Sequence, residues 1–387
     1  MKAFTEPLLS LAGFEEMTKT AEKSSGLISV TGCIDAQKSQ MIYAFGGHRK
    51  NKLIVTFGEQ KAKELYDEYS FFDKEVVYYP SKDVLFYQSD IRGNLLTAER
   101  IRALKAIREQ ERVTIVTTFD ALMNTMAPIE KMWENVLTLE QGQLLDLKEI
   151  QAALIRMGYE KEYQVQTMGQ FSVRGGILDV FPLTEENPIR IELWGDDIDT
   201  IRYFDCESQK SIENTDRVSI YPAAELVLSD EEKAGGIEKL KAEAKRVSDK
   251  LRKQMKTEEA HRVSVMADEL TEEWGELSMY AGMDAFLSYF FDERVGLLDY
   301  FKPSDSLIFF DELTRCTEQG KLTETEFSES MKQRLAMGYI LPGQMNGLFT
   351  EKEIVAKLEK YSCIALGALD NKANGLHQLG SYGIHCQ

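Results

Sequence analysis

Cysteine and histidine are scarce in this chain, and their placement excludes several kinds of site. Five cysteines and four histidines occur among 387 residues. The cysteines are scattered and never form a CxxC pair, so we expect neither a disulfide framework nor a zinc site. The histidines lie outside any recognisable motif, and no arrangement of nucleophile and base is visible.

Long apolar runs are also missing. No stretch of eighteen apolar residues exists, and the first residues, MKAFTEPLLSLAGFEE, carry acids where a signal peptide needs an apolar core. The sequence therefore predicts neither membrane insertion nor secretion. Together with the unpaired cysteines, this favours a protein of the reducing cytoplasm.

Basic residues are outnumbered, 46 against 64 acidic ones, and the net charge is −18. Because duplex DNA is a polyanion, it repels such a chain unless basic residues cluster. One helical, glycine-free stretch has a cluster, diluted by three acids and without aromatic residues for base stacking: Lys239, Lys241, Lys245, Arg246, Lys250, Arg252, Lys253 and Lys256. We interpret it as a solvated helix face, with a weak contact to phosphate or to an acidic protein as the alternative. The overall acidity favours protein partners.

The order of hydrophobic patterns predicts an α/β fold. The length allows two or three domains with their own cores. Residues 1–145 alternate between strand and helix patterns, which indicates a mainly parallel sheet covered on both faces. The expected strands are Leu27–Thr31, Leu53–Phe57, Val76–Tyr79 and Val113–Thr117. The expected helices are Pro7–Lys23, Glu59–Tyr69 and Thr97–Glu109, the last with Thr97 as N-cap.

Two further domains follow. Residues 146–223 are predicted to form a small β-rich domain after a helix at Asp146–Met157. Residues 224–387 are predicted to form a helical domain, with a strand at Leu307–Phe310 that returns to the first sheet. The β-rich and helical parts would then be insertions. Glycines near 343, 347, 367 and 375 suggest loops.

The β-rich segment has an unusual polar face. In residues 188–194 three apolar residues share one side of a strand, and Arg190, Glu192 and Trp194 share the other. Gly195–Asp197 then turns the chain into a hairpin. Tryptophan and arginine are the residue types that dominate binding hot spots. The alternative is structural: Trp194 packs beneath a loop, and Arg190 merely pairs with Glu192.

This segment resembles the domain shared by the excision-repair protein UvrB and the bacterial transcription-repair coupling factors. The resemblance rests on FSVRGGILDVFP, on PIRIELWGDDID and on DCESQ at Asp205–Gln209, and extends more weakly from the N-terminus to about Leu366. It implies that Arg174, Arg190 and Trp194 contribute to binding UvrA. It also implies an N-terminal UvrB-like module, truncated before the polymerase-binding domain and the RecA-like motor.

A phosphate-binding loop follows the first expected strand but is degenerate. A P-loop reads G-x-x-x-x-G-K-[ST]. Aligned from Gly32, the last three positions of this motif are Gln37, Lys38 and Ser39, so glutamine replaces the second glycine. Aligned instead on the V-T-G of the UvrB signature, Asp35 stands where the lysine belongs. The two registers remain open, and both lack an element of the motif.

An apolar strand ending in Asp311–Glu312 looks like a Walker B sequence, in which the acids serve magnesium and the attacking water. Such a pair also arises where a strand simply emerges into a polar loop. We interpret Gly32, Lys38, Ser39, Asp311 and Glu312 as a vestigial nucleotide site. The fold is therefore expected to be a degenerate P-loop NTPase-like sheet.

The function that the resemblance implies is recruitment of UvrA to lesions where RNA polymerase has stalled. UvrA would be the direct partner, and RNA polymerase and duplex DNA would be contacted by C-terminal domains absent here. No cofactor is expected for this chain, since ATP and magnesium would serve the motor of the full-length DNA translocase. The alternatives are an ATP-binding helicase lobe, with this chain itself an enzyme, and a UvrB-like damage-binding protein. Against the latter, the stretch Tyr79–Asp90 is short and acidic for a DNA-inserting hairpin.

Overall fold

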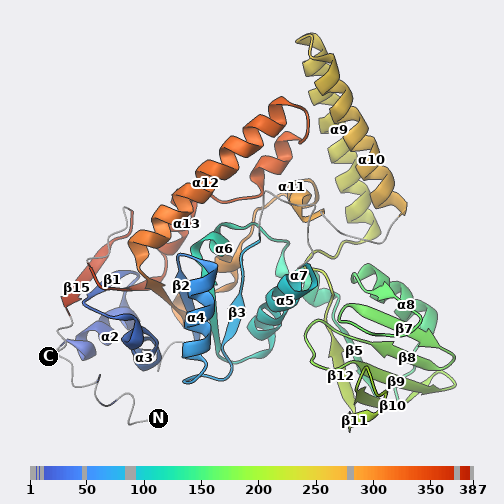
Figure 1. Cartoon of the computed structure of the whole chain (residues 1–387), viewed down its shortest axis with the longest axis horizontal. Coiled ribbons are helices and arrows are strands. Elements are labelled where there is room, and N and C mark those ends of the chain that lie inside the picture. The colour runs from blue at the N-terminus through green and yellow to red at the C-terminus, as the bar shows by residue number, and fades with distance from the viewer. Residues whose placement is uncertain are drawn as a thin grey trace.

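The computed structural model describes residues 6, 8, 13–45, 50–82, 93–276, 283–369 and 375–383. Most of the stretch Tyr79–Asp90 and the start of the expected helix Pro7–Lys23 lie outside these residues. Three parts are visible in Figure 1: an α/β part, a β-rich part and a helical hairpin.

The α/β part is built on a seven-stranded parallel sheet with the order β15-β1-β14-β13-β2-β4-β3. Its strands are β1 (Gly26–Thr31), β2 (Asn51–Thr56), β3 (Val77–Tyr79), β4 (Val113–Thr118), β13 (Ser306–Asp311), β14 (Ser362–Gly367) and β15 (Gln378–Gly383). The predicted return strand, β13, pairs with β2 and β14. The predicted α/β class with a mainly parallel sheet is thus confirmed.

Helices cover both faces of this sheet, because side chains of successive strand residues alternate between two cores. One face holds α2 (Phe14–Lys23), α3 (Asp35–Phe45) and α4 (Glu59–Tyr69). The other holds α5 (Gly93–Glu109), α6 (Phe119–Met123), α7 (Ile129–Glu134), α12 (Leu313–Ala336) and α13 (Glu351–Leu358).

Three details differ from the sequence prediction. The expected helix Pro7–Lys23 is interrupted at Gly13, which adopts φ +86°, so α2 begins only at Phe14. Helix α5 begins at Gly93, so Thr97 lies inside the helix and is not its N-cap. No helix-breaking residue stands between these positions, and the helix therefore starts earlier. Gly367, expected in a loop, ends the buried strand β14.

The β-rich part lies apart from the parallel sheet (Figure 1). Its six-stranded sheet has the order β11-β10-β9-β8-β7-β6, and a two-stranded sheet pairs β12 with β5. The strands are β5 (Leu137–Glu140), β6 (Glu160–Lys161), β7 (Gln170–Arg174), β8 (Ile177–Val180), β9 (Ile189–Trp194), β10 (Asp197–Phe204), β11 (Ser211–Asn214) and β12 (Arg217–Ile220). Helix α8 (Leu147–Arg156) is capped by Asp146, whose side chain accepts hydrogen bonds from two backbone N–H groups. Because β5 shares this core, the part includes residues before the predicted boundary at 146.

A long helical hairpin projects from the body of the molecule (Figure 1). It consists of α9 (Asp230–Lys253), which starts with a capping box between Ser229 and Glu232, and α10 (Thr257–Glu276). Its base packs on α11 (Leu287–Phe290) and on the short 3-10 helices η1 (Met283–Phe286) and η4 (Pro342–Asn346). The remaining 3-10 helices are η2 (Leu297–Tyr300) and η3 (Pro303–Asp305). Among the described helices, none is long and apolar enough to cross a bilayer.

A buried ion network joins the three parts. Glu225, between β12 and α9, accepts hydrogen bonds from Arg100 of α5 at 2.7 and 3.1 Å. Arg100 is fully buried and also donates to the Pro80 carbonyl. Lys82 bridges Glu225, at 3.0 Å, to Asp284 of η1, at 2.9 Å. The junction is therefore fixed by charged groups that satisfy one another.

Candidate functional site

The predicted docking residues lie on the outer face of the six-stranded sheet. The register places Arg174 opposite Ile177, and Asp179 opposite Arg190. The alternating burial of β9 confirms the predicted faces: Ile189 and Ile191 are buried, whereas Trp194 is exposed. Directly opposite residues share a face, so both arginines and Asp179 point away from the domain core.

Asp179 holds the two arginines together. Its Oδ1 accepts from Arg190 Nε at 2.7 Å, and its Oδ2 accepts from Arg190 Nη2 and Arg174 Nη2, both at 2.8 Å. The side chain of Asp179 is only 1% exposed. The bidentate, charge-assisted pair fixes the plane of the Arg190 guanidinium, and Arg174 is held by a single charge-assisted bond. The Asp179 carboxylate also raises the pKa of Arg190.

Arg190 is more enclosed than the sequence predicts. Its side chain is 12% exposed, against 35% for Arg174. It also donates to Gln209 Oε1 at 2.8 Å, and its guanidinium lies 4.3 Å from the centre of the Phe204 ring. The suggested pairing of Arg190 with Glu192 is wrong: Glu192 pairs with Arg202 at 2.6 Å, because the partner of Arg190 is the cross-strand Asp179.

Trp194 stands at the end of β9 and is 80% exposed, so it does not pack beneath a loop. The turn after it uses Gly195 at φ +67°, a backbone conformation that favours glycine. Leu144, 73% exposed, bridges to Asp197, which pairs with Trp194. Two large apolar side chains are therefore displayed at this edge of the domain.

The three predicted residues form one continuous face, which we call the Arg–Trp surface (Arg174, Arg190, Trp194). Trp194 lies four residues along β9 from Arg190, about 13 Å at the usual rise per residue. The Glu192–Arg202 pair fills the space between them. Fixed arginines beside an exposed indole can bind a protein surface that offers carboxylates and an apolar pocket.

The loop between β1 and α3 holds the residues predicted as a vestigial nucleotide site. Gly32 has φ +77°, and α3 begins only three residues later, at Asp35. In a P-loop the lysine stands at the start of the helix. Lys38 instead lies one turn inside α3, and Asp35 occupies the helix start. The geometry thus favours the register in which an aspartate replaces the lysine.

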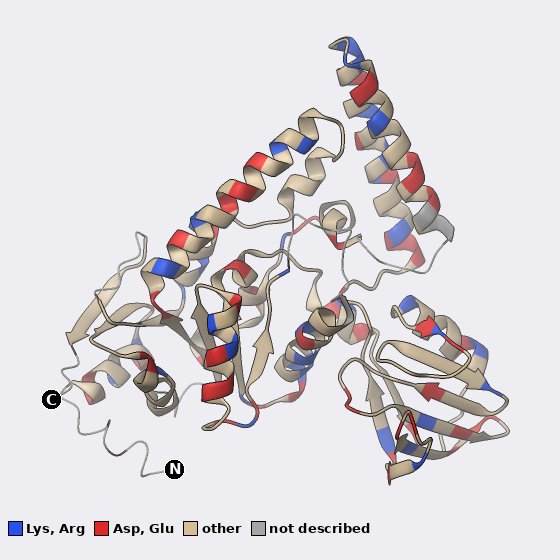
Figure 2. Cartoon of the chain, viewed as in Figure 1, with Lys and Arg blue, Asp and Glu red and all other residues tan. Residues whose placement is uncertain are grey.

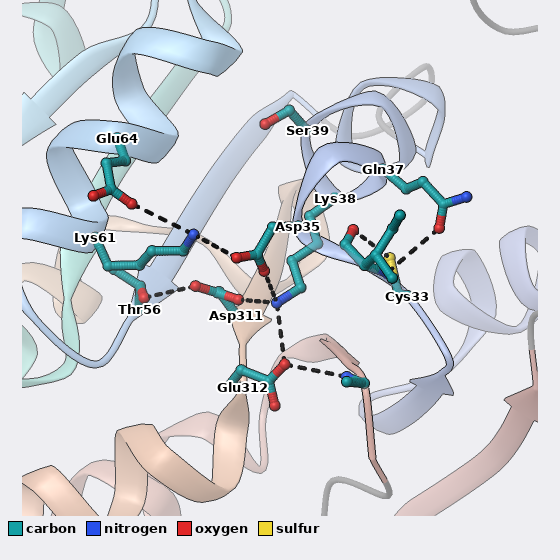
Figure 3. Close-up of polar contacts among 12 residues, drawn as sticks. Cys33, Asp35, Gln37, Lys38, Ser39, Thr56, Lys61, Glu64, Asp311 and Glu312 are labelled. Atoms are coloured by element: carbon teal, nitrogen blue, oxygen red, sulfur yellow. Dashed lines mark hydrogen bonds and ion pairs between the residues drawn. The ribbon is translucent and has the colours of Figure 1, made fainter.

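Lys38 points into a cluster of carboxylates (Figure 3). Its Nζ donates to Asp35 at 2.8 Å, to Asp311 at 2.5 Å and to Glu312 at 3.1 Å. We call these four residues the Lys38 cluster. Thr56 completes it by donating to the second oxygen of Asp311 at 2.9 Å. Ser39 turns away and donates to Glu68 of α4.

Charge pairing shifts the pKa values in this cluster. Burial opposes the charge of Lys38, but the carboxylate of Asp311 and its neighbours raise the pKa of Lys38 above its usual range. Hydrogen bonds from Lys38 and then Lys61 lower the pKa of Asp35 to about 2. Lys38 and Asp35 are therefore charged together at neutral pH.

The backbone N–H groups of the loop also have internal acceptors. The N–H of Cys33 donates to the carbonyl of Gly367, the last residue of β14. The N–H of Gly32 donates to the carbonyl of the next residue, Ala368. The N–H of Ile34 donates to the side chain of Gln37 at 3.4 Å. In a P-loop, N–H groups in these places wrap a phosphate. Within the described residues no group of three His, Cys, Asp or Glu side chains could hold a metal ion.

Comparison with known proteins agrees with this architecture. The family model of the UvrB interaction domain matches residues 137–226, which span the β-rich part. The transcription-repair-coupling factor of Bacillus subtilis (strain 168) is 29% identical over 310 residues, 79% of this chain and 26% of the relative. That of Staphylococcus haemolyticus is 28% identical over 327 residues, 82% of this chain and 27% of the relative.

This chain is similar to the transcription-repair-coupling factors over most of its length, and its β-rich part matches the UvrB interaction domain. A coupling factor of Staphylococcus epidermidis is 28% identical over 345 residues, 87% of this chain. The chain spans little more than a quarter of the length of these coupling factors.

Sequence reasoning missed two residues of the UvrB interaction domain, Asp179 and Gln209. Asp179 is a lone acid between apolar residues of a strand, and alternation from Arg174 through the Gly175–Gly176 turn places it on the arginine face. The sequence pattern alone could therefore have placed Asp179 beside the arginines. Gln209, at φ +58°, reaches Arg190 from the loop after β10, and no local pattern predicts such a contact.

Proposed function

We propose that this chain binds UvrA through the Arg–Trp surface of its UvrB interaction domain. The observation that carries the proposal is the exposed indole of Trp194 beside two arginines fixed by Asp179. Arginine and tryptophan are enriched in binding hot spots, and a side chain held in place loses little freedom on binding.

Coupling of repair to transcription is the wider role that we propose for the whole protein. Bound UvrA would be delivered to lesions where RNA polymerase has stalled. Contact with the polymerase and ATP-driven movement on duplex DNA would reside in the large part of the relatives that this chain does not match.

We further propose that the Lys38 cluster is structural and does not bind nucleotide. A triphosphate would have to compete with three carboxylates for Lys38 and would meet the negative charge of Asp35 at the helix start. The loop N–H groups would also have to leave their internal acceptors.

The test is quantitative binding of purified UvrA to the purified chain. We expect Trp194→Ala to weaken binding by about 2–4 kcal/mol, or roughly 30- to 1,000-fold in Kd, because a central apolar anchor is removed. Phe71→Ala is the matched control, since Phe71 is 82% exposed and lies just after α4 in the α/β part. Unchanged affinity in a folded Trp194 variant would reject the proposal.

Arg190→Ala is a second variant that needs its own stability measurement. It leaves the buried Asp179 with Arg174 as its remaining cationic partner, which we expect to cost about 1–3 kcal/mol of unfolding free energy. Arg217→Ala serves as its control, because Arg217 is 65% exposed and forms an ion pair with Glu140 in the same domain. Trp194 is therefore the cleaner probe of binding.

A further inference from the structure

The distal end of the α9–α10 hairpin is a basic site in an acidic molecule. Residues 245–256, which we call the basic tip, contain six basic residues and one aspartate, a net charge of +5 against −18 for the whole chain. Figure 2 shows basic residues at this end of the hairpin, far from the parallel sheet. A polyanion would therefore meet less repulsion at the tip than the net charge of the chain suggests.

In the described part of the chain, the arginines of the tip form ion pairs with acidic side chains, whereas three of its lysines do not. Arg246 pairs with Glu243 at 2.7 Å, and Arg252 pairs with Asp249 at 3.5 Å. Among the described residues, no carboxylate lies within ion-pair distance of Lys250, Lys253 or Lys256, and all three are exposed. The charges left to a partner are thus compact ammonium groups.

Three basic residues of the tip are spaced so that they lie on the same side of α9. Arg246, Lys250 and Lys253 stand at i, i+4 and i+7 and so share one side of α9. Their Cα atoms rise by about 10 Å over these seven residues. The dipole of α9 favours cations in its last turn, but Lys256 lies beyond the helix and Lys245 two turns before its end. Stabilisation of the helix end therefore does not account for the whole set.

The start of α10, next to the tip, packs against the chain that follows α12. Gly338, at φ +75°, lets the chain pass closely against the carbonyl of Glu259 at the start of α10. Arg262 donates to Tyr339 Oη at 3.1 Å and lies over its ring. These contacts brace the hairpin just below the tip, so little ordering is required when a partner binds.

At the apex, Met255 adopts φ +65° and is 86% exposed. The N–H of Lys256 donates to the Leu251 carbonyl, and that of Met255 to the Arg252 carbonyl, the pattern of a Schellman motif. That position is usually glycine. The motif turns the chain so that Lys253 and Lys256 flank the apex on either side.

We propose that the basic tip binds the phosphate backbone of duplex DNA without sequence preference. Lysine suits phosphate as a point charge, whereas recognition of protein carboxylates favours the arginine fork, and both arginines are already paired. The tip has no aromatic residue, so stacking on single-stranded bases is not available. A single exposed methionine is too small an apolar face for a membrane surface.

The test is binding of a fluorescently labelled duplex of mixed sequence to the purified chain, followed by anisotropy. We expect weak binding with Kd of about 10⁻⁴–10⁻⁶ M at physiological salt, and a slope of log K against log salt of about −3. Lys250→Glu/Lys253→Glu should lower affinity at least tenfold, and Lys250→Gln/Lys253→Gln should reduce the slope by about 2.

The matched control is Lys332→Glu/Lys352→Glu, which changes net charge equally at two exposed lysines outside the hairpin. It should retain binding within about twofold. An equal loss in both charge-reversed variants would show that net charge, and not the tip, governs binding. Tighter binding to labelled poly-glutamate than to the duplex, or no duplex binding at low salt, would equally overturn the proposal.

Discussion

Two buried carboxylates decide what the neighbouring basic side chains can do. Asp179 holds Arg174 and Arg190 at the surface of the UvrB interaction domain, where part of each arginine side chain remains exposed. Asp311 holds Lys38 at 2% exposure, where it is not accessible. The same kind of pair thus presents a cation for binding in one place and withdraws it in the other.

The Lys38 cluster predicts a loss of stability on substitution. Lys38→Ala should lower the unfolding free energy by about 3–5 kcal/mol, because Asp311 is left buried without its cation. The double variant Lys38→Ala/Asp311→Asn should recover more than half of this loss, since the uncompensated charge is gone. Urea unfolding of both variants measures the difference.

Nucleotide binding would contradict a purely structural role of the Lys38 cluster. Micromolar binding of a fluorescent ATP analogue by the unmodified chain, lost in Lys38→Ala, would favour the helicase-lobe alternative. A structural cluster predicts no such binding in either protein.

Residue faces could be read from the sequence, but residue partners could not. A period of two placed Arg190 and Trp194 on one side of β9. The partner of Arg190 depended on the register of β8 against β9, which is set by the whole sheet. For this reason Glu192, adjacent in the pattern, was the wrong partner and Asp179 was overlooked.

Among the elements, the α9–α10 hairpin carries a local strain that the rest of the helix pair offsets. Non-glycine residues at positive φ are disfavoured, and Met255 has no buried contact to compensate, being 86% exposed. Below it, Leu251, Ala260 and Val263 pack in the core of the hairpin. The helices therefore impose the turn.

Met255→Gly should stabilise the hairpin. Relief of the left-handed conformation exceeds the added freedom of the unfolded chain, and we expect a gain of about 0.5–1 kcal/mol. Met255→Ala, which keeps the strain, should change stability by less than about 0.5 kcal/mol. Thermal unfolding of the three proteins checks this, and equal stability of the glycine and alanine variants would contradict it.

Long, strongly patterned elements were the ones that sequence predicted best. The expected helix Glu59–Tyr69 matches α4 at both ends, and the strand at 307–310 is β13. Strand β14 was not predicted, because the pattern of Ser362–Gly367 combines small residues with a glycine. It lies between β1 and β13 in the sheet, and its residues pack into the cores on both faces.

At the scale of the whole molecule, the junction network gives stability a dependence on pH. Burial alone would raise the pKa of Glu225, but Arg100 and Lys82 lower it from 4.5 to about 2. A carboxyl whose pKa is lowered on folding contributes stability above its unfolded pKa, and this contribution is lost as pH falls towards the folded value.

Glu225→Gln should therefore be destabilised at pH 7 by about 3–5 kcal/mol, because Arg100 stays buried without a counter-charge. The difference in unfolding free energy between this variant and the unmodified chain should become smaller as pH falls from 4.5 to about 2. Urea unfolding across this range measures it, with the exposed Glu231→Gln as control. A difference in unfolding free energy that does not change with pH would show that the charge of Glu225 does not contribute to stability.

The strand order of the parallel sheet has a consequence for biosynthesis. Strands β1 and β2 are separated in the sheet by β14 and β13, although they follow each other in the chain. A nascent chain that has left the ribosome with only its first 145 residues cannot unite them. The UvrB interaction domain, whose strands are all local, can fold first, and the large sheet must wait for translation to reach Gly367.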